Sequence, residues 1–206
     1  MVALFVGFRL YAVLGRRTGH EQQPVTRPEA VPSAEPAAPI ADVAPERSEG
    51  GAVSYEDRAA AGIRAIVAAD PSFDVARFLD GAKAAYRMIL EAFWKGKQDE
   101  LSDLVGDKVR ATFAAAIAAR EAAGHRMDNR LIAIERALIQ DAQLEGRTAS
   151  ITIRFDADIA AVTRSEAGEL VAGSLTDAVS THDIWTFRRT LGSPDPNWLL
   201  VETDEA

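Results

Sequence analysis

The spacing of the hydrophobic residues changes once within the C-terminal three quarters of the chain, at Gly124, and this change limits the fold more than any other feature. Before Gly124, apolar residues recur every three or four positions, which is typical of an amphipathic helix. After it, they alternate with polar residues, which is typical of a strand with one buried face. Helices followed by an antiparallel meander predict an α+β fold.

The helical part contains three expected long helices and one short one. Ser72 and Asp74 are the two candidate N-caps of the second helix, because a side-chain oxygen there can accept from the exposed backbone N–H groups of the first turn. Gly96 and Gly124 are expected to stop the second and last helices. The four helices are predicted over residues 54–70, 74–96, about 99–105 and about 108–123.

The clearest strand is Ser150–Ile159, in which five apolar residues alternate with five polar ones. Its carboxylates Asp156 and Asp158 share the wet face and are expected to be solvated. His182 and Asp183 are the adjacent pair that could suggest a base and the carboxylate that orients it, but neighbours on a strand point to opposite faces, so they are not expected to form a dyad. Further strands are predicted over residues 131–138, 170–175, 181–191 and 198–203.

The N-terminal run Met1–Leu14 is apolar except for Arg9. As a helix it would span about 21 Å, less than the roughly 30 Å of a bilayer core. A signal peptide, an interfacial helix, a buried first helix of the domain, and the end of a transmembrane helix that starts upstream all remain open. The paired arginines that follow favour a membrane segment with a cytoplasmic flank. We expect residues 1–18 to be a membrane anchor, with contacts from Leu4, Phe5, Phe8, Leu10, Arg16 and Arg17.

Residues 19–53 separate this anchor from the folded part. They hold six of the nine prolines and few large apolar residues. Such a composition buries too little surface to offset the entropy of ordering, so we expect a disordered tether. The α+β domain is then expected over residues 54–206.

Composition and motifs argue against several kinds of chemistry. The chain has 0 cysteines, which excludes disulfides and thiolate metal sites, and a net charge of −8, which disfavours nucleic-acid binding. No phosphate-binding or hydrolase motif occurs. Asp99, Asp103 and Asp107 are four residues apart but lack a calcium-loop pattern, so they are interpreted as a solvated face. No catalytic residue, metal or cofactor is expected.

Seven aromatic residues are candidates for the lining of a pocket between helices and sheet, although such residues more often form the core. A curved sheet on helices can leave a concave apolar cavity of the kind that binds ligands, lipids or peptides. The seven are Phe78, Tyr86, Phe93, Trp94, Trp185, Phe187 and Trp198.

Three segments together give the chain a resemblance to a known family. They are FDVARFLDGAKAAYRMILEAFWKGKQDEL at Phe73–Leu101, HDIWTFRR at His182–Arg189 and DPNWLLVET at Asp195–Thr203, and GRRTGHE at Gly15–Glu21 adds to them. In this order they resemble the Tim44-like family, which comprises the mitochondrial inner-membrane import-motor subunit and its bacterial relatives.

The resemblance implies a nuclear-transport-factor-two-like cone, with helices packed on a curved antiparallel sheet around an apolar pocket, and no enzymatic activity. Mitochondrial members recruit a heat-shock chaperone to the presequence translocase. The region that binds this chaperone precedes the shared domain, and residues 19–53 do not match it. Chaperone recruitment is therefore not implied for this chain by its own sequence.

The expected function is a membrane-associated, non-enzymatic adaptor or scaffold. It would bind a protein client, a lipid or both, in protein translocation or envelope protein handling. The client would be a translocase component or a chaperone. The membrane would be the inner membrane, where the chain would contact anionic lipid, with its C-terminal domain on the cytoplasmic side. A small-molecule-binding or lyase/isomerase-type enzyme of the same cone fold is the alternative. An exported periplasmic binding module is a third reading, disfavoured by Arg16 and Arg17.

Overall fold

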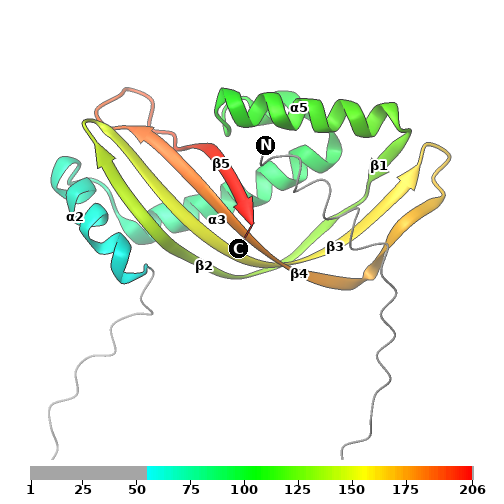
Figure 1. Ribbon diagram of the computed structural model, residues 1–206, viewed down its shortest axis with the longest axis horizontal. Coiled ribbons are helices and arrows are strands. Elements are labelled where there is room, and N and C mark those ends of the chain that lie inside the picture. Colours follow the sequence, from blue (N-terminus) through cyan, green and yellow to red (C-terminus); the bar gives the residue numbers. More distant parts are fainter. Residues whose placement is uncertain (1–54, 206) are drawn as a thin grey trace, which may run out of the picture.

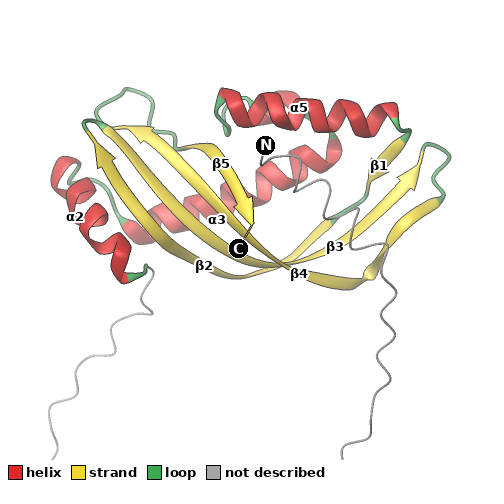
Figure 2. Ribbon diagram, viewed as in Figure 1, coloured by secondary structure: helices red, strands yellow, loops and turns green. Residues whose placement is uncertain are grey.

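The computed structural model describes residues 55–205, so the predicted anchor (1–18) and tether (19–53) lie outside the described residues. Helices come first in the chain and strands follow, as the sequence colours of Figure 1 show, and Figure 2 distinguishes the helices from the strands. The elements in chain order are η2 (Asp57–Ala59), α2 (Ala60–Ala69), α3 (Val75–Lys95), α4 (Gln98–Leu101), α5 (Asp107–Ala122), β1 (His125–Met127), β2 (Arg130–Glu145), β3 (Thr148–Ser165), β4 (Leu170–Thr190) and β5 (Leu199–Glu205).

The ends of α3 follow the capping residues expected from the sequence. The Asp74 carboxylate accepts a hydrogen bond from the Arg77 backbone N–H at 2.7 Å. Gly96 ends the helix with φ 71°, a left-handed conformation that glycine adopts without a steric penalty. The helix expected over residues 99–105 is shorter, because the chain leaves α4 at Leu101 and Val105 then bridges to Leu200 on β5.

All five strands belong to one antiparallel sheet with β3 at its centre. Both β1 and β2 pair with β3, β2 along its first part and β1 at its end. On the other side β3 pairs with β4, and β4 with β5. The three-residue strand β1 was not expected from the sequence, because it is too short to show alternation.

One expectation about the strands is wrong: residues 170–175 and 181–191 form the single strand β4. Ser174 pairs with Ala161 and Val179 with Ile159, so residues 175–178 stand opposite Ala160 alone. The chain between the two expected strands therefore contains a bulge, which increases local twist and bends the strand. Gly173 beside it has φ 90°, and a Cβ there would lie 1.9 Å from the Ala161 carbonyl oxygen.

The sheet is curved, and α3 and α5 lie on its concave side (Figure 1). The apolar face of β3 points to these helices: Ile151, Ile153 and Phe155 are fully buried, as the alternation predicted. The helix α2 covers the outer edge of β2, and Gly62 allows this close approach because a Cβ there would lie 1.7 Å from the Ala142 carbonyl oxygen. The predicted α+β class with a curved antiparallel sheet is confirmed.

Between residues 55 and 205, none of the helices has the length and hydropathy to cross a bilayer.

Candidate functional site

The predicted pocket residues come together in the structure, and most of them are buried. Phe78, Tyr86, Phe93, Trp94, Trp185 and Phe187 are at most 8% exposed. Tyr86 stacks on Phe155 with ring centroids 4.4 Å apart and lies 4.6 Å from the Trp185 ring. Trp198, which is partly buried, contacts Phe78 at 4.8 Å. These rings fill much of the space between α3 and the sheet by packing against one another.

Two of the buried residues form a hydrogen bond across the core. The Tyr86 hydroxyl donates to the Asp183 carboxylate at 2.6 Å, and the side chain of Thr181 donates to the same oxygen at 3.4 Å. Asp183 is 9% exposed, and burial raises the pKa of its carboxyl. Burial, together with the nearby Asp183 charge, also raises the pKa of the Tyr86 hydroxyl. The indole Nε1 of Trp185 is buried without a hydrogen-bond partner beside this pair.

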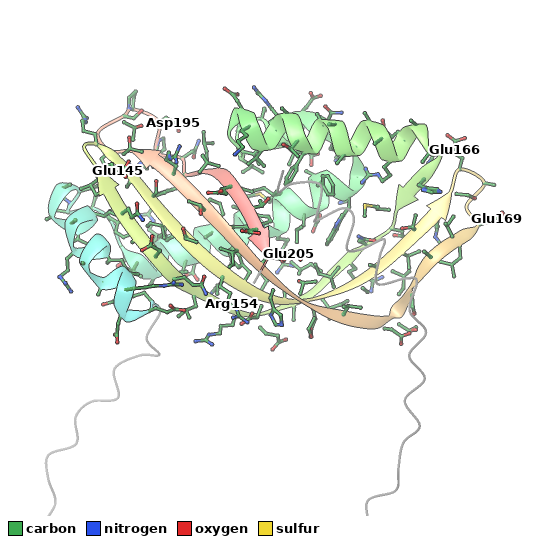
Figure 3. All side chains as sticks on the ribbon, in the orientation of Figure 1. Glu145, Arg154, Glu166, Glu169, Asp195 and Glu205 are labelled. Carbon is green, nitrogen blue, oxygen red and sulfur yellow. The ribbon has the colours of Figure 1, made fainter. Side chains whose placement is uncertain are left out.

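His182 lies on the opposite, convex face of the sheet, as the alternation of the strand predicted. Its Nδ1 is 2.7 Å from the Asp156 carboxylate, which also accepts from Arg154 Nε at 2.8 Å. Figure 3 shows Arg154 on this outer side. Partial burial alone would raise the pKa of Asp156, but its hydrogen bonds to Arg154 and His182 outweigh that effect and lower it. Asp156 is therefore less solvated than expected, with 19% of its side chain exposed.

A cavity of about 480 Å³ lies where the C-terminal ends of α3 and α5 meet the sheet. Its walls are Trp94 and Lys95 from α3, Arg120 and Glu121 from α5, residues 124–127 at the start of β1, and Glu166 from the turn between β3 and β4. Figure 3 shows Glu166 at this turn, beside the end of α5. Among the predicted pocket residues, Trp94 contributes to these walls.

Arg120 is the half-buried cation of this cavity. Its Nη2 donates to the Phe93 carbonyl oxygen at 3.2 Å and its Nη1 to the Met127 sulfur at 2.9 Å. The guanidinium carbon lies 5.5 Å from the centre of the Phe93 ring. The Glu121 carboxylate is its charged neighbour: Glu121 Oε1 and Arg120 Nη2 lie 3.2 Å and 3.6 Å from the position that a Cβ on Gly96 would take. Burial lowers the pKa of Arg120, and the charge of neighbouring Glu121 offsets this in part.

The family model of the Tim44-like domain matches residues 59–205, which cover α2 to α5 and all five strands described. The chain belongs to the Tim44-like family. Members of this family are membrane-associated, take part in protein interactions and are generally not enzymes. The predicted cone architecture is confirmed in its helices and its curved antiparallel sheet.

One solved structure similar to this Tim44-like chain is the intermembrane space region of the chloroplast protein ARC6. The identity is 14% and the TM-score 0.42, over 66% of this chain and 98% of that one. A comparison with curated proteins found no match.

The sequence reasoning missed the cavity of this Tim44-like domain and its principal cation. Gly96 and Gly124 were recognised as helix stops, but nothing local shows that the two helix ends meet. Lys95 and Arg120, which lie in the last turns of α3 and α5, were the available signal. Basic residues at helix ends usually complement the helix dipole, so this signal is weak by itself. His125 lies at the start of β1, in the cavity wall.

Proposed function

We propose that the chain is a non-enzymatic adaptor of the bacterial inner membrane, whose α+β domain binds a protein client on the cytoplasmic side. Membership in the Tim44-like family over residues 59–205 is the observation that carries this proposal. The sequence adds an apolar N-terminal run followed by Arg16 and Arg17. The client is a protein, such as a translocase component or a chaperone, engaged in protein translocation or envelope protein handling.

The adaptor acts by raising local concentration at the membrane, and no bond is made or broken. A flexible chain as long as residues 19–53 has a root-mean-square reach of about 30 Å, and its prolines extend that reach, so the domain meets nearby clients at high effective concentration. Arg16 and Arg17 each add about 1 kcal/mol of attraction to an anionic lipid surface. The apolar side chains Leu4, Phe5, Phe8 and Leu10 insert beside them.

Membrane fractionation combined with in-cell crosslinking tests both parts of the proposal. The full-length protein and two variants are compared: Phe8→Asp in the apolar run and Val31→Asp in the proline-rich stretch, as a control with the same added charge. An aspartate in the middle of a membrane segment costs about 2.5–3.5 kcal/mol, so Phe8→Asp is expected to reduce membrane partitioning roughly 100-fold. Val31→Asp is expected to remain with the membrane.

Crosslinking identifies the client in the same cells. Recovery of one inner-membrane, secretion or chaperone protein with the wild type and Val31→Asp, and its loss with Phe8→Asp, is the expected result. Equal membrane recovery of all three proteins would refute the anchor. A protein that crosslinks reproducibly to no partner would refute the adaptor.

A small-molecule-binding or lyase/isomerase-type role is the second candidate, and one observation favours it. Asp183 is buried on the concave side with a raised carboxyl pKa and a hydrogen bond to Tyr86, which is the environment of many catalytic acids. Thermal-shift screening of small organic compounds against the wild type, Asp183→Asn and His182→Ala separates the two roles. A compound that stabilises the wild type and His182→Ala but not Asp183→Asn would favour this second role.

A further inference from the structure

The cavity between the ends of α3 and α5 has no part in the adaptor function proposed above, and its walls have the features of a ligand site. Its volume of about 480 Å³ is within the range of small-molecule sites in proteins, roughly 300–1,000 Å³. Four separate segments of the chain contribute walls to it, so the fold itself positions the lining side chains.

The state of Arg120 indicates the chemistry of the ligand. A guanidinium that is partly removed from water is usually paired with a carboxylate or phosphate. Here one nitrogen donates to a thioether sulfur, a weak acceptor, and another to the last turn of α3 at Phe93. The guanidinium is therefore held in place by these contacts and by the Phe93 ring, and neither of its two hydrogen-bond acceptors is an anion.

The charged side chains around the cavity limit how much negative charge a bound anion can carry. Lys95, Arg120 and Arg126 stand against Glu121 and Glu166, which leaves a formal charge of one positive with His125 neutral. Lys95 is already 3.0 Å from Glu91 outside the cavity. The negative ends of the α3 and α5 dipoles further oppose a highly charged ligand. A dianion such as phosphate is therefore disfavoured. A single planar carboxylate fits better, because its two oxygens can accept parallel hydrogen bonds from two N–H groups of the guanidinium.

We propose that this cavity binds an organic monocarboxylate, with the carboxylate on Arg120 and an apolar stem against Trp94. The ligand carboxylate replaces the Met127 sulfur as the acceptor of the hydrogen bond from Arg120 Nη1. The source of the carboxylate is either a free organic acid or the C-terminal residue of a polypeptide, because both present the same group on an apolar stem.

Nuclear magnetic resonance of the tryptophan indole N–H groups tests the proposal on the full-length chain in detergent micelles. The chain has three tryptophans, and Trp94→Phe assigns the signal of the one in the cavity wall. Sodium phenylacetate is the probe, and phenylacetamide is its uncharged counterpart. We expect a saturable shift of the Trp94 signal with phenylacetate at millimolar concentration, and at least a tenfold weaker response to phenylacetamide.

Three variants assign the binding to Arg120. Arg120→Gln removes the charge and the guanidinium, and is expected to weaken phenylacetate binding about 10- to 100-fold, as for a lost hydrogen bond to a charged group. Arg120→Lys keeps the charge and is expected to bind with intermediate affinity. The control is Arg110→Gln on the same helix, whose guanidinium is 2.6 Å from Asp107, and it is expected to bind as the wild type does. Unchanged signals of the other two indoles show that each variant is folded.

The remaining probes separate the sources and the competing ligands. Tighter binding of N-acetyl-phenylalaninate than of phenylacetate supports a polypeptide C-terminus, and the reverse order supports a free acid. Equal responses to phenylacetate and phenylacetamide would overturn the proposal, even if Arg120→Gln fails to fold. So would tighter binding of inorganic phosphate than of phenylacetate, or a Trp94 response to phosphatidylglycerol vesicles alone. None of these results depends on whether the chain binds a membrane or a client.

Discussion

The buried hydrogen bond between Tyr86 and Asp183 is expected to stabilise the domain to a degree that depends on the charge of the carboxylate. The two oxygens are 2.6 Å apart, and Tyr86 is 0% and Asp183 9% exposed, so water does not readily replace a lost partner. A hydrogen bond to a charged group contributes about 1.5–3 kcal/mol, and one between neutral groups about 0.5–1.5 kcal/mol. Tyr86→Phe is therefore expected to lower the free energy of unfolding by about 1.5–3 kcal/mol when Asp183 is ionised.

The same substitution made in the Asp183→Asn background is expected to cost only about 0.5–1.5 kcal/mol, because the amide oxygen accepts a neutral hydrogen bond. The double-mutant cycle thus isolates the effect of the charge. Urea unfolding followed by tryptophan fluorescence is a suitable assay, because the Trp185 ring lies 4.6 Å from that of Tyr86. In thermal unfolding the single variant should lose about 3–12 °C, at roughly 2–4 °C per kcal/mol for a domain of this size.

The pH dependence of stability gives an independent test of the same pair. Burial raises the pKa of Asp183 above its ordinary value of 3.8, so the folded protein holds this proton at pH values where the unfolded chain has lost it. The contribution of this group to stability is therefore greatest below 3.8 and falls as the pH rises through the folded pKa. Asp183→Asn is expected to remove this decline.

Tyr55→Phe, at a partly buried tyrosine, is the control and is expected to change stability by less than about 0.5 kcal/mol. A cost of Tyr86→Phe below about 0.5 kcal/mol would refute the reasoning, since the lower limit for even a neutral bond lies there. Equal costs of Tyr86→Phe in the wild-type and Asp183→Asn backgrounds would also refute it.

Three further changes test the packing and capping of the helices. Gly62→Ala places a Cβ 1.7 Å from the Ala142 carbonyl oxygen, so urea unfolding should show a loss of about 1–3 kcal/mol; a neutral result would contradict the close packing of α2 on β2. Gly81→Ala, in α3 with no neighbouring atom within 4 Å, should instead stabilise by about 0.5–1 kcal/mol in the same assay, and a loss would show a hidden contact. Asp74→Ala removes the α3 N-cap and should cost about 1 kcal/mol in thermal unfolding, and an unchanged melting temperature would contradict the capping role of this carboxylate.

Local sequence patterns predicted most of the elements, because their causes lie within a few residues. The cap at Asp74, the stop at Gly96 and the alternation of β3 all depend on backbone preferences and side-chain spacing of neighbouring residues. The opposite orientations of His182 and Asp183 follow from the two-residue period of a strand, and the structure confirms them. The family resemblance followed from short motifs in a fixed order, and the family match confirms it.

The tertiary structure decided what depends on residues far apart in the chain. Tyr86 and Asp183 are 97 residues apart, and only the packing of α3 on the sheet brings them into contact. Residues 170–190 form one strand with a bulge opposite Ala160, because pairing with β3 continues on both sides of that bulge. The cavity around Arg120 exists because two helix ends, β1 and a turn converge, and no local spacing encodes that convergence. The sequence by itself therefore determined the elements and the family, whereas long-range pairing decided the continuity of β4, the buried pair and the cavity.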